Sequence, residues 1–196
     1  MSLKVKEIFY SLQGEGGRQG EASIFIRLSG CNFKCPFCDT DFSGGDEMTP
    51  EAILQTIRAF SCRWIIWTGG EPTLQLTDAI LQFFKQAGYR QAIESNGRQR
   101  LSALLDYTVV SPKLQYGEDY ALRCNPRVDE VRLPIQAGQQ IPDIQIFPLA
   151  QYYFLSPVFE ESLQNTKRNI DYCIEHIMQH PRWRLSVQLH KLVGMK

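Results

Sequence analysis

The chain has 196 residues, of which 43% are hydrophobic and 11% aromatic, enough for one domain with a substantial core. Lys plus Arg and Asp plus Glu both number 21, and this neutrality argues against a general nucleic-acid binder, which would carry a basic excess. No apolar stretch approaches the roughly 20 residues that span a bilayer, and the N-terminus lacks the pattern of a secretion signal, so we expect a cytoplasmic protein without membrane partners.

Short apolar runs alternate with helical patterns along the chain, which indicates an α/β fold with mostly parallel strands. Thr49 is a good N-cap and Pro50 suits the first position of a helix over 49–60, while Gly88 is placed to end a second helix over 76–88. A third helix is predicted over 163–179. Strands are predicted at 3–10, 22–30, 63–72, 90–97, 107–113, 129–135, 151–158 and 184–190.

Polar, glycine-rich stretches form the last residues of three of these predicted segments, just after the apolar part of each strand. They are Gly69–Pro72, Glu94–Gly97 and Ser111–Lys113. Such segments after successive parallel strands are typical of the active-site face of a barrel. A full eight-unit barrel needs about 250 residues, so this shorter chain predicts an incomplete, pared-down TIM-type barrel. With no linker or repeat, residues 1–196 are expected to form a single domain.

Three cysteines lie close together in "CNFKCPFC", at positions 31, 35 and 38. Three thiolates are too few for a closed zinc site, although His190 could complete one. The alternative is a four-iron cluster whose fourth iron is left open for an exchangeable ligand such as S-adenosylmethionine.

His176 and His180 stand four residues apart and are expected on a solvated helix face. The remaining cysteines, at positions 62, 124 and 173, are expected to be buried as small hydrophobic residues.

The cysteine spacing, with aromatic Phe37 before Cys38, resembles the motif of the radical S-adenosylmethionine (SAM) superfamily. In that superfamily the aromatic residue contacts the adenine of SAM. "TGGEP" (68–72) resembles its second element, a Gly-Gly-Glu loop that receives the methionine amino group. Both motifs occur in the expected order, each after a predicted strand.

Further stretches resemble the 7-carboxy-7-deazaguanine synthase family: "FYSLQGEG", "CDT", "ESNG", "VVSPK" and "LSVQLHK". The resemblance implies a lyase that converts 6-carboxy-5,6,7,8-tetrahydropterin to 7-carboxy-7-deazaguanine, with loss of ammonia, for queuosine and related 7-deazapurines of tRNA. It also implies a 4Fe-4S cluster, SAM and Mg²⁺ as cofactors, a homodimer, and a flavodoxin or ferredoxin as electron donor.

The same resemblance implies roles for individual residues. Arg27 would pair with the substrate carboxylate, a task suited to a guanidinium group, and the hydroxyl of Thr40 would ligate Mg²⁺, a metal that prefers oxygen. Substrate contacts are implied for Leu12, Gln13, Gly14, Arg27 and Thr68. Cluster ligation is implied for Cys31, Cys35 and Cys38, and SAM contacts for Phe37, Cys38, Asp39, Gly70, Glu71, Ser111, Pro112, Lys113 and Ser156.

Two alternatives to the synthase stay open at this point. A glycyl-radical-enzyme activase shares the cysteine spacing, and a zinc-binding module would need no catalysis. The chain departs from the family at Ser156, where members often carry glutamine, and at Val193–Lys196, where some relatives end in a proline that reaches the substrate. No role is assigned to this terminal segment or to Glu94, and the partners of Glu71 are left open.

Overall fold

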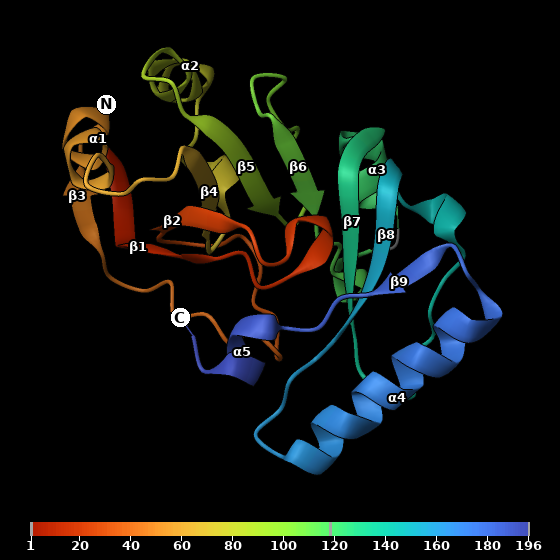
Figure 1. Cartoon of the computed structure of the whole chain (residues 1–196). Coiled ribbons are helices and arrows are strands. Elements are labelled where there is room, and N and C mark those ends of the chain that lie inside the picture. Colours follow the sequence, from red (N-terminus) through yellow and green to blue (C-terminus); the bar gives the residue numbers. More distant parts are fainter. Residues whose placement is uncertain (1, 118, 196) are drawn as a thin grey trace. The chain divides into compact units, whose positions relative to one another are not determined.

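The computed structural model, drawn in Figure 1, describes residues 2–117 and 119–195. Contacts within the chain divide it into two compact units. Unit 1 comprises the chain up to Leu12, Glu21–Ser95 and Gln99–Thr108. Unit 2 comprises Gln13–Gly20, Asn96–Arg98 and the chain from Val109 onward. The backbone therefore passes between the units five times.

The sheet of unit 1 has the strand order β3-β1-β2-β4-β5. The strands β2, β4 and β5 run parallel, as predicted, whereas β1 is antiparallel to both of its neighbours. The short connection between β1 and β2 explains why these two strands are antiparallel, because a parallel crossover needs a dozen or more residues. The strands are β1 (Leu3–Leu12), β2 (Ala22–Leu28), β3 (Asp46–Met48), β4 (Trp64–Gly69) and β5 (Arg90–Ser95).

Two helices cover one face of this sheet, α1 (Pro50–Ile57) and α2 (Asp78–Gln86). The Thr49 hydroxyl caps α1 as predicted, and the Thr77 hydroxyl, a cap that was not predicted, accepts a hydrogen bond from α2 in the same way. The apolar faces of both helices join the strands in one core of fully buried side chains. Its members include Ile24, Ile26, Leu28, Ile53, Ile57, Ile65, Trp67, Leu81 and Phe84. Since this face is filled, the half-buried side chains that alternate with it along β2 and β4 are the ones available to a ligand.

The strands of unit 2 are β6 (Tyr107–Val110), of which the last two residues belong here, β7 (Arg127–Ile135), β8 (Leu149–Pro157) and β9 (Trp183–Leu185). They pair in parallel in chain order, and the long helix α4 (Leu163–Gln179) packs on β8 and β9, as Figure 1 shows. The bounds of α4 match the predicted helix. Two short helices were not predicted, α3 (Tyr120–Cys124) and α5 (Leu189–Val193).

The predicted strand over 184–190 is wrong beyond Leu185. Ser186 N still donates to Leu155 O of β8, but Leu189 N donates to Gly14 O and Val187 O accepts from Gln19 Nε2. The loop 13–20 thus satisfies backbone groups that a longer strand would have paired with β8. The part of the chain that the structure describes also has four short 3₁₀ turns: η1 (Gly16–Arg18), η2 (Pro72–Leu74), η3 (Leu114–Tyr116) and η4 (Ile144–Ile146).

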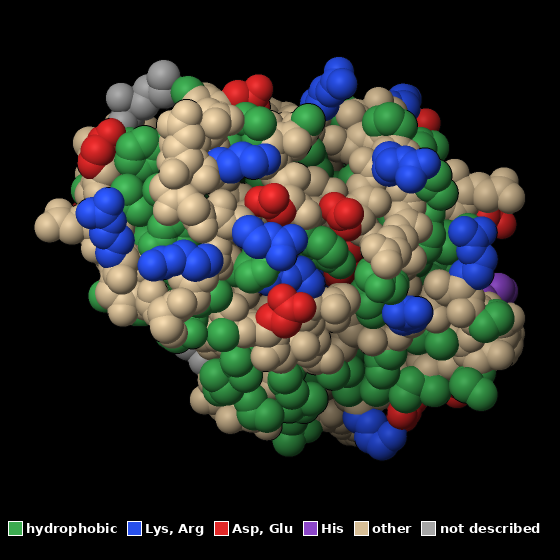
Figure 2. Space-filling model, turned by 45° about the horizontal axis from the view of Figure 1, so that its top comes forward, with side chains coloured by type: hydrophobic (Ala, Val, Ile, Leu, Met, Phe, Trp, Pro, Cys, Tyr) green, Lys and Arg blue, Asp and Glu red, His purple; other side chains and the backbone are tan. Residues whose placement is uncertain are grey.

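Within the described residues, no helix is both long enough and apolar enough to cross a membrane. Basic and acidic side chains are interspersed on the face shown in Figure 2, in keeping with the neutral composition.

Of the three scattered cysteines, Cys173 is buried as predicted, while Cys62 and Cys124 are half-buried. Burial raises the pKa of the Cys173 thiol to about 12.

Candidate active site

The three clustered cysteines lie in an irregular loop directly after β2. Cys31 and Cys35 are half-buried and Cys38 is exposed, and Cys38 N donates to Cys35 O over 3.1 Å. Burial raises the pKa of the Cys31 thiol, and the nearby Glu71 carboxylate and Cys38 raise it further. The hydrogen bond from the Phe33 N–H lowers it in part. In the described part of the chain, no three Cys, His, Asp or Glu side chains converge on one point as ligands of a single metal ion must. The thiolates of a four-iron cluster bind different irons, so they need not share one coordination sphere.

The Gly-Gly-Glu loop after β4 is hydrogen-bonded to the start of the cysteine loop. Gly70 N donates to Leu28 O over 3.0 Å, and Glu71 N donates to Gly30 O over 2.8 Å. A Cβ atom at position 70 would collide with the Gly30 carbonyl oxygen, so only glycine permits this approach. Three partly accessible thiols beside a backbone cradle of this kind fit a thiolate-bound cluster with one open position.

Glu71 is almost fully buried, with 1% of its surface exposed. Its Oε1 accepts hydrogen bonds from Thr73 N (3.1 Å), Thr73 Oγ1 (2.7 Å) and Ser95 Oγ (2.8 Å). Ser95 is the last residue of β5, so the ends of two neighbouring parallel strands hold this carboxylate. Neither Thr73 nor Ser95 was predicted, although "ESNG" had marked the end of β5 as a polar site segment.

Arg27 and Thr68 are adjacent on neighbouring strands, because they are register partners in the parallel β2–β4 pair. Arg27 is also the cross-strand partner of Glu7 on β1, and its Nε donates to Glu7 Oε1 over 2.7 Å. The guanidinium lies over the ring of Phe9, which stacks on Phe25. Glu7, Arg27 and Thr68 therefore form one row on the face opposite the apolar core. Sequence reasoning missed Glu7, because strand register is not readable from one strand alone.

Thr40 follows the third cysteine by two residues and is half-buried. The loop beyond it is anchored by Asp41, which accepts from Lys6 Nζ (2.7 Å) and from Ser43 Oγ (2.6 Å). These partners, Lys6 first, lower the pKa of the Asp41 carboxyl far below its usual range. Ser29 Oγ also donates to Gly44 O, closing the loop back onto the end of β2. Phe37 is half-buried and Asp39 exposed in the same loop.

In unit 2, the segment Ser111–Lys113 follows β6 and is held by Tyr120. Lys113 N donates to the Tyr120 hydroxyl over 2.7 Å, and that hydroxyl donates to Asn96 O over 3.0 Å. Lys113 Nζ donates to Ser111 Oγ, and Pro112 between them is buried. Tyr120 was not foreseen as a site residue, since it lies on the short α3 that propensity did not predict.

Ser156 and the turn at residues 13–14 also lie in unit 2. Ser156 is buried on β8, and its hydroxyl donates to Ser186 O. Gln13 is buried, its Oε1 accepts from Glu15 N, and Gly14 is so close to His190 that a Cβ atom would collide with the imidazole. Leu12, the last residue of β1 in unit 1, pairs with Ala22. Lys196 lies outside the described residues.

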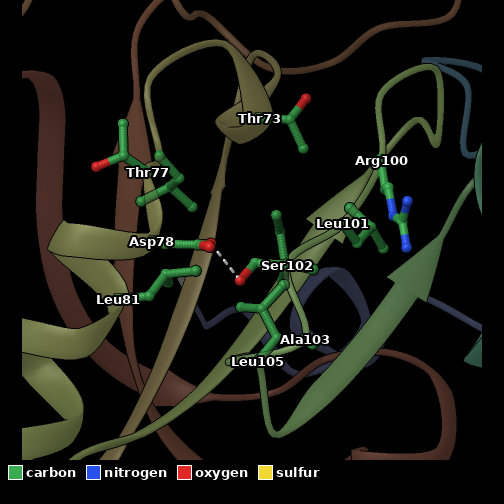
Figure 3. A pocket seen from close by; sticks show the side chains of 11 residues that line it. Thr73, Thr77, Asp78, Leu81, Arg100, Leu101, Ser102, Ala103 and Leu105 are labelled. Atoms are coloured by element: carbon green, nitrogen blue, oxygen red, sulfur yellow. Dashed lines mark hydrogen bonds between the residues drawn. The ribbon is translucent and has the colours of Figure 1, made fainter.

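A cavity of about 360 Å³ lies beside the start of α2, shown in Figure 3. Thr73 is on its rim, and Asp78 there accepts a hydrogen bond from Ser102 over 2.6 Å. None of the residues predicted for the active site lines it. Substitutions at this cavity should therefore leave the active site unaltered.

The model of the radical SAM superfamily matches residues 25–177. The chain is 40% identical to the 7-carboxy-7-deazaguanine synthase of Bacteroides thetaiotaomicron over 196 residues, covering 100% of both chains. It belongs to the 7-carboxy-7-deazaguanine synthase family. A second family member, from Haemophilus influenzae, is 37% identical, with 100% of this chain and 95% of the relative covered.

A solved structure has the same fold as this chain. The crystal structure of QueE from Escherichia coli superimposes with a TM-score of 0.73 at 25% identity, covering 97% of this chain and 95% of that one. The predicted pared-down α/β radical SAM fold is thereby confirmed, as are the predicted family and its enzymatic nature. Membership in a radical SAM family also means that the protein works with a 4Fe-4S cluster and SAM.

Proposed function

We propose that the protein is a 7-carboxy-7-deazaguanine synthase, which contracts the ring of 6-carboxy-5,6,7,8-tetrahydropterin with loss of ammonia. The observation that carries this is the Gly-Gly-Glu loop, hydrogen-bonded to the start of the three-cysteine loop beside a strand that presents Arg27. The names of the full-length relatives supply the product, and the pterin substrate is the one that the resemblance to the family implies. None of these relatives bears the name of a glycyl-radical-enzyme activase, so that alternative gains no support.

Cys31, Cys35 and Cys38 are the proposed cluster ligands, and Gly70 and Glu71 the proposed contacts of the methionine part of SAM. When bound, the reduced cluster and SAM supply a one-electron cleavage that lets an unactivated hydrogen be removed from the substrate. The chain's part is to hold the cofactor: the Glu71 carboxylate, oriented by Ser95 and Thr73, is suited to bind an ammonium group. Phe37, Asp39, Ser111, Pro112, Lys113 and Ser156 are the remaining proposed SAM contacts.

Arg27 is the proposed partner of the substrate carboxylate. Its Nε donates to Glu7, and a guanidinium that binds one carboxylate through Nε still has two terminal nitrogens with which to bind a second. Thr68, its register partner, brings a hydroxyl to the same face. Leu12, Gln13 and Gly14 are the proposed contacts of the pterin edge, where a glycine allows a flat ring to approach the backbone closely.

Thr40 is the proposed protein ligand of Mg²⁺. A single hydroxyl is enough for this ion when the substrate carboxylate and waters complete the octahedron. The metal would offset the negative charge of the carboxylate during the rearrangement. The salt bridge between Lys6 and Asp41 stabilises the loop that carries this threonine.

Several wider features belong to the same proposal. The chain would act as one radical SAM domain over residues 1–196, which its repeated passage between the two units supports. It would work in the cytoplasm as a homodimer, receive electrons from a flavodoxin or ferredoxin, and deliver its product toward queuosine and other 7-deazapurines of tRNA.

The decisive experiment is anaerobic turnover of the reconstituted protein with reductant, SAM, Mg²⁺ and the carboxytetrahydropterin, followed by mass spectrometry. We expect a brown protein that forms 5′-deoxyadenosine, ammonia and 7-carboxy-7-deazaguanine. A protein that cleaves SAM but leaves the pterin unchanged would reject the substrate. A colourless protein that retains zinc would reject the enzyme altogether.

A further inference from the structure

A network of buried charges attaches the loop 13–20 to strand β7 within unit 2. Arg132 donates through Nε (2.9 Å) and Nη2 (2.7 Å) to Glu130 Oε1, and through Nη1 (3.0 Å) to Glu15 Oε2. The exposed fraction is 0% for Glu130 and 6% for Arg132. We call these three side chains the Arg132 network. Nothing assigned above makes use of it.

The backbone of the loop rests directly on this network. Gly17 N donates to Glu130 Oε2 over 2.9 Å, and η1 packs against β7 (Figure 1). Gly16 has a φ of +72°, and a Cβ atom there would collide with the Glu130 carboxylate and the Arg132 guanidinium. Glycine is therefore required at position 16 both by its backbone conformation and by the lack of space.

The network continues on the other side into the chain's last segment. Gln188 Nε2 donates to Glu15 Oε1 over 2.9 Å, and Ser186 Oγ accepts from Gly16 N over 2.9 Å. Leu189 N donates to Gly14 O over 2.9 Å. Glu15 thus joins three segments that lie far apart in the sequence.

A buried ion pair is a poor way to gain stability, because desolvation offsets much of the attraction. The Arg132 guanidinium, however, binds one carboxylate on each side, and its planar geometry permits only one arrangement of the two carboxylates. Gln13 and Gly14 directly precede Glu15, so any shift of Glu15 displaces them. The geometry points to the Arg132 network as a device that fixes the orientation of this turn.

We propose that Arg132, acting through Glu15, is a positioning residue that presents Gln13 and Gly14 to the pterin ring. This inference rests on the proposed function, in which those two residues contact the substrate. It assigns the network to substrate binding, and not to the handling of SAM or to the chemical step.

The test uses Glu15→Gln in the reconstituted holoenzyme, because this variant removes the charge that Arg132 binds and weakens the link at Glu15, while the buried Glu130–Arg132 pair stays intact. Arg132→Met would leave two carboxylates without their cation and endanger folding, so Arg132→Lys is the second variant. We expect KM for the pterin to rise about tenfold in Glu15→Gln, the equivalent of about 1.4 kcal/mol. KM for SAM and kcat at saturating pterin should stay within about twofold of the unaltered protein.

Lys167→Met is the matched control, because it breaks an exposed ion pair of the same unit, between Lys167 and Asp171. It should leave every parameter unchanged. If Arg132 acts through the turn, Glu15→Gln should add little to the KM of a Gln13→Ala variant, since coupled residues are not additive. Hydrogen exchange should rise at residues 13–20 in Glu15→Gln and not in β4 or β5.

Two results would overturn the positioning role, provided that the unaltered enzyme makes deazaguanine. One is an unchanged KM for the pterin in Glu15→Gln, and the other is an equal rise in the KM for SAM. Faster exchange confined to the loop, without a change in pterin KM, would also reject it. Failure of the proposed function gives a different result, because the unaltered protein would then form no deazaguanine at all.

Discussion

The Ser95 hydroxyl donates a 2.8 Å hydrogen bond to Oε1 of Glu71, joining the ends of two neighbouring parallel strands inside unit 1. Hydrogen bonds to a buried charged group contribute about 1.5–3 kcal/mol. Ser95→Ala should therefore loosen Glu71 and reduce SAM cleavage by about tenfold or more, measured as 5′-deoxyadenosine release with and without pterin.

The control for Ser95 is Ser102→Ala, which also removes a serine–carboxylate hydrogen bond in unit 1, but at the exposed cavity of Figure 3. It should leave SAM cleavage unchanged. Equal activity in both variants would show that the orientation of Glu71 does not matter to the cofactor.

Gly70→Ala tests the close approach of the two site loops. The added methyl group would collide with the Gly30 carbonyl, so the loops must separate and the cysteine loop must shift. We expect reconstituted protein with fewer irons per chain and no detectable SAM cleavage, read by iron analysis and product assay. Gly88→Ala is the control, because its Cβ would meet no atom within 4 Å and only its positive φ is strained. That variant should lose about 1 kcal/mol of stability and keep its activity.

Arg27→Lys should raise KM for the pterin, because lysine keeps the charge but loses the fork that can bind Glu7 and a carboxylate together. A rise of about 10- to 100-fold is expected for the loss of one bidentate charged contact. Glu7→Gln should give a smaller rise of the same kind. Arg123→Lys, at the exposed pair with Asp119, is the control and should show no effect. A KM that does not change in Arg27→Lys would remove Arg27 from the substrate site.

Thr40→Ala should shift the Mg²⁺ titration of deazaguanine formation to higher concentration, because the proposed hydroxyl ligand is lost. Thr40→Ser retains a hydroxyl and should restore the response. Cluster content and SAM cleavage without pterin should be equal in all three proteins. An identical Mg²⁺ titration for the alanine variant would exclude Thr40 as a ligand.

Cys173 should resist alkylation in the folded protein, because burial raises its pKa to about 12 from 9.0. Mass spectrometry of iodoacetamide-treated protein at pH 8.5 should find it modified only after denaturation. The folded state holds this proton more tightly than the unfolded chain does. The contribution of this thiol to the stability of the folded protein is therefore fully present below pH 9. It is lost as the pH rises from about 9 toward 12. Ready modification of Cys173 in native protein would contradict its burial.

Much of the fold was predictable because the signals are local. Thr49 caps a helix where its sequence position indicates, and the bounds of α4 match those predicted from its pattern. The predicted strand over 184–190 failed for a non-local reason. β9 ends early because the distant loop 13–20 takes over the hydrogen bonds of residues 187–189.

The amino-acid sequence by itself determined the cysteine spacing, the Gly-Gly-Glu loop and the family, because these are patterns of neighbours in one segment of chain. Only the tertiary structure decided which distant groups hold those segments in place. Ser95 is hydrogen-bonded to Glu71, Glu7 to Arg27, and Arg132 to Glu15. The physical reason is that such partners are chosen by strand register and loop packing, which bring together residues as far apart in the sequence as Arg132 and Glu15, 117 positions. No local pattern of residue types records that choice.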